Sequence, residues 1–162
     1  MAAESAGILM YRRREGGVVE LLLIHPGGPY WRNKDAGAWS IPKGEYGPDE
    51  KPEAAARREF AEELGFAAEG VLRPLGDIRQ KGGKRVTAFA LEGDLDTSSI
   101  TSISFEMEWP RGSGRMRSFP EVDRADWFTF AEAREKILAS QTPLIDRLLA
   151  LLGSKGDPRP GD

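Results

Sequence analysis

The sequence predicts a single domain of α/β structure, and three observations support this prediction. The chain has 162 residues, the length of one ordinary domain. Hydrophobic residues make up 40% of it and charged residues 30%, proportions typical of a globular protein and not of a disordered one. Strand-like segments stand on both sides of a strongly helical segment, and no internal repeat is visible. We therefore expect one domain over residues 1–152.

The first two elements are expected to form an antiparallel hairpin. Residues 6–12 and 18–25 are apolar and rich in strand-forming side chains, and Glu15-Gly16-Gly17 between them favours a tight turn. The second run is almost continuously apolar, which indicates a strand buried on both faces. A loop rich in turn-forming residues follows over residues 26–35, and a short strand is expected over residues 39–42.

Residues 52–64 carry the clearest helical pattern in the chain. Pro52 suits the first turn of a helix, and Glu53 complements the positive end of the helix dipole. Gly65 stands where a C-terminal cap belongs. A helix with these bounds is therefore expected.

The second half of the chain predicts four strands and two helices. The elements expected are strands over residues 72–80, 85–91, 105–109 and 125–128 and amphipathic helices over residues 130–139 and 143–152. The first two of these strands are joined across Gly82-Gly83, and the polar residues 94–104 are expected to form a loop. Glycine, proline and charged residues over 153–162 predict a disordered tail.

Composition and charge exclude several classes of function. The 23 basic and 26 acidic residues give a formal net charge of −3, so general nucleic-acid binding is not expected. The chain has no cysteine, and its one histidine, His25, cannot form a histidine-rich metal site. The many acidic side chains instead suit a hard cation such as Mg²⁺ or Mn²⁺.

The sequence predicts no association with a membrane. It contains no run of about 18 apolar residues that could span a bilayer. Residues 1–5 lack the basic and apolar regions of a signal peptide. We therefore expect a cytoplasmic protein with no membrane partner, while the oligomeric state stays open.

A cluster of glutamates on the helix over residues 52–64 is the first candidate for chemistry. It comprises Glu59, Glu62 and Glu63. Related as i, i+3 and i+4, these side chains lie within a sector about 100° wide, where their charges repel one another and a divalent cation would reverse that repulsion. A solvated acidic face is the alternative. Arg58, which can pair with Glu50, and Gly44, which lets backbone oxygens approach a metal, favour a metal site.

The segment from Gly44 to Phe66 resembles the Nudix box, GX5EX7REUXEEXGU, in which U is a bulky apolar residue. Gly44 is followed after five residues by Glu50, and after seven more by the nine residues 58–66, REFAEELGF. All nine specified positions of the box match, so a chance match is very improbable. The flanking elements resemble the same family over about residues 6–150, most closely its small bacterial NTP pyrophosphohydrolases. This resemblance implies a Nudix-type α/β/α sandwich with a mixed sheet.

The resemblance also implies a reaction and a cofactor. The reaction is the hydrolysis of a nucleoside diphosphate linked to another group, in which water attacks one phosphorus. Mg²⁺ or Mn²⁺ would be held by Glu59 and Glu63, with the carbonyl of Gly44 as a further ligand. Glu62 would either bind a second ion or accept a proton from water.

Three other acidic or basic residues receive catalytic roles by the same resemblance. Arg58, held by Glu50, would orient the neighbouring carboxylates. Glu121 stands six residues before Trp127, and this spacing resembles the segment that carries an extra acidic residue in Nudix polyphosphate hydrolases. We expect Glu121 to be the general base and rank Glu106 second; an ordinary loop carboxylate is the alternative for Glu121.

Basic residues near the box are candidate phosphate contacts. Lys43, which directly precedes the box glycine, would bind a phosphate group unless it is an ordinary surface lysine. Lys81, Lys84 and Arg85 flank the Gly82-Gly83 turn and would bind the outer phosphates of a long substrate. For this group, a solvated hairpin tip is the alternative.

Aromatic residues are candidate contacts for a base. Trp39 would stack on a base, with a core position as its alternative. Tyr30 and Trp31 lie in a glycine-rich loop and would form a mobile base-stacking lid. His25 ends an apolar run and is expected to be a hydrogen-bonded structural residue.

The residues around the box narrow the substrate class. The lead-in WSIPKG, residues 39–44, resembles the W-x-x-P-K-G segment of Nudix diadenosine polyphosphate hydrolases. The tyrosine that those hydrolases often carry beyond the box is missing, because Gly82, Gly83 and Lys84 stand there. The SQPWPFPxS segment of NADH-cleaving members is also absent. We expect a small-molecule partner, a nucleoside polyphosphate, with dinucleoside polyphosphates and (d)NTPs both open.

A non-catalytic Nudix-fold module that senses a nucleotide is the alternative function. Such proteins commonly lose one or more box carboxylates. This chain keeps all of them: Glu50, Glu59, Glu62 and Glu63. That inventory favours an enzyme, a Nudix pyrophosphohydrolase.

Overall fold

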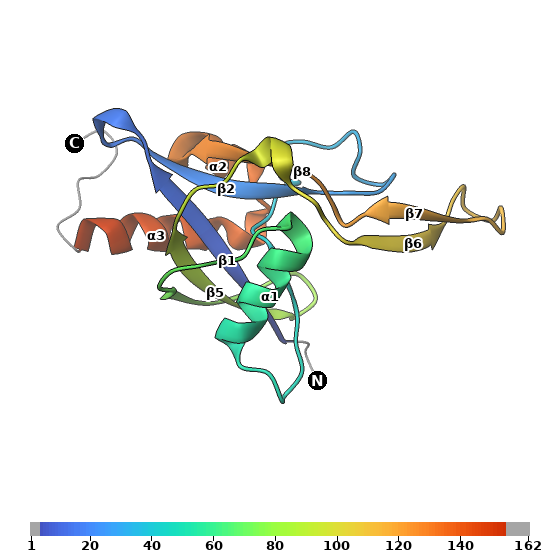
Figure 1. The fold of residues 1–162 in the computed structure, drawn as a ribbon, viewed down its shortest axis with the longest axis horizontal. Helices are drawn as coiled ribbons and strands as arrows, with labels where there is room; N and C mark the ends of the chain where they lie inside the picture. The colour runs from blue at the N-terminus through green and yellow to red at the C-terminus, as the bar shows by residue number, and fades with distance from the viewer. Residues whose placement is uncertain (1–3, 155–162) are drawn as a thin grey trace.

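A mixed β-sheet forms the centre of the computed structural model, which describes residues 4–154 (Figure 1). Its strands are β1 (Glu4–Arg13), β2 (Val19–Pro26), β3 (Lys43–Glu45), β4 (Arg73–Arg79), β5 (Arg85–Glu92) and β8 (Val122–Thr129). The order is β4-β5-β1-β2-β8, and β3 also pairs with β1. β1 runs parallel to β5 and antiparallel to both β2 and β3, so the expected hairpin of β1 and β2 is confirmed.

Helices cover both faces of this sheet. They are α1 (Pro52–Leu64), α2 (Phe130–Lys136) and α3 (Thr142–Ser154). Alternate residues of β1 face opposite layers: Ile8 packs in the core cluster that includes α1, and Leu9 packs in the cluster that includes α3. The predicted α/β/α sandwich with a mixed sheet is therefore confirmed. None of the helices within residues 4–154 is long and apolar enough to cross a membrane.

Helix α1 has the bounds that the sequence predicts. Pro52 is at its start and Glu53 lies in its first turn. Gly65 ends it in a left-handed conformation with φ 77°, and its N–H donates to the carbonyl of Ala61. Few other residues adopt that conformation without strain, so the position of Gly65 fixes the end of the helix.

A separate two-stranded sheet extends away from the main body (Figure 1). It consists of β6 (Ser104–Glu108) and β7 (Met116–Pro120), paired antiparallel. The sequence predicts β6 but not β7, whose residues are mostly exposed and show no apolar alternation. A short 3-10 turn, Thr97–Ser99, interrupts the expected loop before β6.

Two expected bounds need correction. Residues 39–42 do not form a strand, because Trp39 and Ser40 make only single bridges. The strand of this segment that pairs with β1 is β3, a few residues later. Helix α2 ends at Lys136 because Ile137 leaves the helical conformation and turns into the core. The backbone of Trp39 bonds to Lys136 and Leu138 on either side of this turn.

The expected disordered tail lies almost wholly outside the described residues. Gly153 and Ser154 are the exception, because they belong to the last turn of α3. The helix therefore extends two residues beyond the domain boundary expected from the sequence.

Candidate active site

The structure gathers the three helical glutamates of the box, Glu59, Glu62 and Glu63, around one pocket of about 410 Å³, here called the acidic pocket. Its lining residues come from α1, from β1 and β3, from the β4–β5 turn and from the start of β8. They are Ser5, Lys43, Gly44, Glu45, Glu59, Glu62, Glu63, Lys84 and Glu121. Glu121 is more than fifty residues from the helix in sequence, and the fold brings it beside the helical glutamates as the spacing to Trp127 predicts. Its role as a base stays a prediction.

The helical glutamates of this pocket and Glu121 are partly or largely buried, which makes their charge costly. Glu59 and Glu63 are each only 8% exposed. Burial, together with the nearby charge of Glu59, raises the pKa of Glu63 to about 8. Burial also raises the pKa of Glu59 and, with a contribution from Glu62, that of Glu121. A bound cation would offset this accumulated negative charge.

Arg58 holds the acidic side of the pocket together. Its Nε and Nη2 donate to both carboxylate oxygens of Glu50 at 2.8 and 2.9 Å, the two-pronged arrangement that guanidinium groups prefer. Its Nη1 donates to Glu59 at 2.8 Å and to Glu62 at 3.2 Å. These bonds, those to Glu50 foremost, raise the pKa of the guanidinium and keep it charged.

Gly44 leaves room for the side chain of Glu59. It does not have a positive φ, so its backbone suits any residue. A Cβ at this position would lie 2.0 Å from Cδ of Glu59, so any side chain there would force the Glu59 carboxylate to move. Next to it, the backbone N–H of Lys43 donates to Oε1 of Glu63 at 3.1 Å. β3 thus positions both buried glutamates of α1.

The donors of the acidic pocket fit a hard divalent cation in kind. Carboxylate oxygens are the ligands that Mg²⁺ and Mn²⁺ prefer, and a bound cation would counteract the burial that raises the pKa values of Glu59 and Glu63. Within residues 4–154, no group of three or more histidine, aspartate or glutamate side chains is arranged to hold a metal ion. In this arrangement, one carboxylate oxygen of Glu59 and one of Glu62 pair with Arg58.

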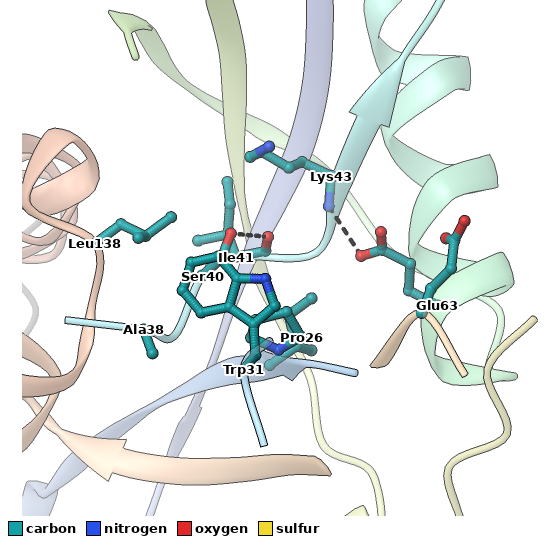
Figure 2. A pocket seen from close by; sticks show the side chains of 10 residues that line it. Pro26, Trp31, Ala38, Ser40, Ile41, Lys43, Glu63 and Leu138 are labelled. Carbon is teal, nitrogen blue, oxygen red and sulfur yellow. Dashed lines mark hydrogen bonds between the residues drawn. The ribbon is translucent and has the colours of Figure 1, made fainter. Parts of the chain in front are cut away.

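A second cleft of about 210 Å³ adjoins the acidic pocket and is here called the aromatic cleft. It is lined by Ile24, Pro26, Trp31, Ala38, Ser40, Ile41, Lys43, Glu63, Glu121 and Leu138. In the view of Figure 2, the Trp31 indole lies between Leu138 and Glu63. Lys43, Glu63 and Glu121 line both cavities, so the two adjoin at these residues.

Lys43 stands where the two cavities meet. Burial, and then the nearby ammonium of Lys84, lower the pKa of its side chain. No hydrogen bond or ion pair joins this ammonium to another residue of the described chain. An anion at the junction would therefore gain a partly desolvated positive charge.

Trp39 does not occupy the base-stacking position that was expected for it. It is 3% exposed and lines neither cavity. Its Nε1 donates to Asp35 at 2.8 Å, and its ring packs edge-on against His25 and Phe128. Trp39 is therefore a core residue, the alternative already considered, and it is not placed to stack on a base.

His25 has the structural surroundings expected for it. The ring is fully buried. Its Nδ1 lies 2.8 Å from Oδ1 of Asp123, and its Nε2 lies 2.6 Å from the carbonyl oxygen of Lys34. These contacts tie β2 to the start of β8 and to the loop that carries Trp31.

The two aromatic residues of the expected lid take different positions. Trp31 lines the aromatic cleft, whereas Tyr30 packs edge-on against Trp109 with ring centroids 6.0 Å apart. The Arg111 guanidinium donates to the Tyr30 hydroxyl and lies over its ring. Tyr30 therefore connects its loop to the β6–β7 hairpin.

The basic residues of the β4–β5 turn also separate. Lys81 is exposed and lines neither cavity, and Arg85 pairs with Glu4 and Asp77 outside the pocket. Lys84 is the member of this group that lines the acidic pocket, where it bonds to Glu45 at 2.9 Å. The expectation that Lys81 and Arg85 contact outer phosphates is thus not supported by their placement.

Sequence reasoning missed Ser5, and it ranked Glu106 as an alternative base that the structure places elsewhere. Glu106 is exposed on β6 and lines neither cavity. Ser5 lines the acidic pocket because β1 pairs with β3 on one side and β5 on the other. No motif marks a single serine at a strand start, so only the strand register reveals it.

Comparison with known proteins identifies the family to which the chain belongs. The family model described as NUDIX domain matches residues 1–148, and the chain therefore belongs to the NUDIX family. The prediction of a Nudix pyrophosphohydrolase, an enzyme that cleaves a pyrophosphate bond, is confirmed at that level. Enzymes of this family generally use divalent metal ions. A search of curated proteins found no match.

Solved structures share the fold at low sequence identity. An Ap4A hydrolase of C. elegans, solved as a binary complex, superposes with a TM-score of 0.65 and is 22% identical over 93% of this chain and 98% of that one. The mutT/nudix family protein of Listeria innocua gives 0.64 and 18% over 95% and 96%. The NUDIX domain of Shewanella oneidensis NrtR, complexed with ADP ribose, gives 0.63 and 15% over 94% and 89%.

Arg58→Ala is expected to reduce both stability and rate. It removes the partner of Glu50 and frees Glu59 and Glu62, and we expect a loss of about 1–3 kcal/mol because the Arg58 side chain is 37% exposed and not deeply buried. Arg57→Ala is the matched control: Arg57 bonds only to the carbonyls of Ala68 and Gly70, so it should lower stability without lowering kcat. Urea unfolding and steady-state kinetics test both variants; an unchanged kcat in Arg58→Ala would contradict its orienting role.

Proposed function

We propose that the chain hydrolyses a pyrophosphate bond of a nucleoside polyphosphate, either a dinucleoside polyphosphate or a (d)NTP. The observation that carries this proposal is that the two cavities adjoin and share three lining residues. One is lined by Trp31 and apolar side chains and suits a base, and the other is lined by carboxylates and lysines and suits a phosphate chain bound with a cation. Lys43, Glu63 and Glu121 stand at their junction, where the bond to be broken would lie.

Different residues in and beside the acidic pocket have different roles in the proposed reaction. Glu59 and Glu63, with the carbonyl of Gly44, would hold Mg²⁺ or Mn²⁺, which when bound neutralises phosphate oxygens and activates water. Arg58 and Glu50 orient Glu59, because the guanidinium fork fixes one side of the carboxylate cluster. Glu62 assists as a further ligand or as a proton acceptor. Glu121 accepts the proton of the attacking water, and burial, which raises the pKa of Glu121, makes its carboxylate a stronger base.

The names of structural neighbours support the substrate class. One neighbour is an Ap4A hydrolase, and another is a NUDIX domain complexed with ADP ribose. Both compounds contain an adenosine and a pyrophosphate bond. The sequence WSIPKG over residues 39–44 favours the first of these substrates. Trp39 itself is buried in the core and does not line the aromatic cleft.

A hydrolysis panel tests the proposed function. The panel contains NTPs, oxidised dNTPs, dinucleoside polyphosphates, ADP-ribose and inositol pyrophosphates, each with Mg²⁺ and each with product identification. We expect cleavage of at least one nucleoside polyphosphate, with products that retain the nucleotide. Tight binding of a nucleotide without turnover of any compound would favour the nucleotide-sensing module instead.

Lys43→Ala is expected mainly to raise KM. The Lys43 ammonium would contact a phosphate in the bound substrate and in the transition state alike, and loss of such uniform binding raises KM with little change in kcat. We expect an increase of roughly tenfold, the value of one hydrogen bond to a charged group. A collapsed kcat with an unchanged KM would instead place Lys43 in transition-state stabilisation.

A further inference from the structure

The Ser5 hydroxyl is a buried polar group without a partner. Ser5 is 1% exposed, and its Oγ makes no hydrogen bond with any of the described residues. Buried hydroxyls are almost always hydrogen-bonded, because leaving one unpaired costs free energy on folding. Ser5 also lines the acidic pocket, so a ligand in that pocket is an available partner.

The strand register sets Ser5 beside the lysines of the pocket. Ser5 pairs with Glu45 and Gly7 pairs with Lys43 across β1 and β3, so these side chains share one face of the sheet. Gly7 provides the room, because a Cβ there would lie 2.6 Å from Cβ of Lys43. Lys84 reaches the same pocket from the β4–β5 turn. An unpaired hydroxyl and two ammonium groups therefore line the wall formed by β1, β3 and the β4–β5 turn.

The Ser5 hydroxyl and the ammonium groups of Lys43 and Lys84 do not supply one another with a negatively charged partner. Two ammonium groups close enough to repel each other gain from an anion placed between them. Among residues 4–154, Lys84 is bound only to Glu45, a partner that is 63% exposed and thus easily exchanged for a phosphate. Ser5 and Lys84 line the acidic pocket but not the aromatic cleft, whereas Lys43 lines both.

We propose that Ser5 and Lys84, together with Lys43, form a subsite for the phosphate groups that lie beyond the hydrolysed bond, on the side away from the base. This inference rests on the proposed function, since it takes the base to occupy the aromatic cleft. Ser5 donates a hydrogen bond to a phosphate oxygen, and Lys84 leaves Glu45 to bind the same group. The subsite selects substrates with three or more phosphates over those with two.

Binding of diimidotriphosphate (below, imidotriphosphate), the analogue of tripolyphosphate in which both bridging oxygens are replaced by NH, tests the subsite without turnover. Calorimetry with Mg²⁺ present should show that Ser5→Ala weakens binding about tenfold and Lys84→Met at least as much. Lys84→Arg should keep most of the affinity because the charge remains. Lys51→Met is the charge-matched control: Lys51 is exposed just before α1, outside both cavities, and its loss should change nothing.

Thermal unfolding separates a ligand role from a structural role for Ser5. Because Ser5→Ala removes a buried hydroxyl that has no partner, the Tm of the variant should equal or exceed that of the unaltered protein. A lower Tm would show that Oγ supports the fold, and would overturn the proposal. Unaltered binding of the probe by Ser5→Ala and Lys84→Met would overturn it as well.

The hydrolysis panel distinguishes failure of the subsite from failure of the proposed function. If the unaltered protein cleaves nucleoside polyphosphates while both variants bind imidotriphosphate normally, the subsite is wrong and the function stands. If probe binding depends on Ser5 and Lys84 but no compound is cleaved, the subsite stands and the function is wrong. No binding of the probe by the unaltered protein refutes the subsite.

Discussion

Glu63→Gln and Glu59→Gln should each abolish most hydrolysis while the fold is retained. An amide keeps the volume of the carboxylate and can still accept the bond from the Lys43 N–H, but it loses the negative charge that a divalent cation requires. We expect a fall in kcat of at least about 10³-fold, because the bound cation contributes several kcal/mol of transition-state stabilisation. Steady-state kinetics and calorimetric titration with Mg²⁺ should weaken together. Near-normal rates in both variants would show that the metal assignment is wrong.

The same substitution at Glu63 should make stability less dependent on pH. The folded-state pKa of about 8 lies above the ordinary value of 4.5, so the folded protein binds this proton more tightly than the unfolded chain does. The stabilisation is complete below about pH 4.5 and is lost as the pH rises to about 8. Unfolding in EDTA at pH 5 and pH 8 should therefore show a larger loss for the unaltered protein than for Glu63→Gln. An equal loss in both would mean that the Glu63 carboxylate is not strained by burial.

Glu121→Gln should lower kcat by roughly 10²–10⁴-fold with little change in KM, the usual contribution of a positioned general base. Burial, with the charge of Glu62, raises the pKa of Glu121, so the rate of the unaltered enzyme should fall as the pH drops through that raised value. The variant should lack this acidic limb. A pH profile of kcat for both proteins measures the effect.

Glu106→Gln is the matched control for Glu121→Gln. It makes the same chemical change on β6, at an exposed position that lines neither cavity, so its kcat should be unaltered. A loss below about threefold in Glu121→Gln, together with a large loss in Glu106→Gln, would transfer the role of base to the β6–β7 hairpin.

The local pattern of the sequence predicted the parts of the fold that depend on neighbours in the chain. Helix α1 is an example, because Pro52, the periodic apolar residues and Gly65 all act within a few residues of each other. Once the bounds of the helix are known, its periodicity places Glu59, Glu62 and Glu63 on one face. β7 could not be predicted in this way, since its exposed residues carry no alternation and its only strand partner is β6.

The remaining parts of the site depend on contacts between distant segments. Lys81, Lys84 and Arg85 are equivalent by composition, and only the conformation of the turn selects Lys84 for the pocket. Ser5 reaches the pocket because of its register against Glu45, and a shift of one residue would turn it to the opposite face. Trp39 was ambiguous for a related reason, because an aromatic side chain suits both a core and a base-binding surface.

The contact between Gly44 and Glu59 affects how catalytic capacity is lost as related proteins diverge. A single added methyl group at Gly44 collides with the carboxylate of Glu59, so any side chain there must displace this proposed metal ligand while leaving every acidic residue in the sequence. A descendant could thus become a nucleotide-binding protein without catalysis in one mutational step, and its count of box glutamates would not reveal the change. The glycine is therefore as informative as the glutamates for separating catalysts from sensors on this scaffold.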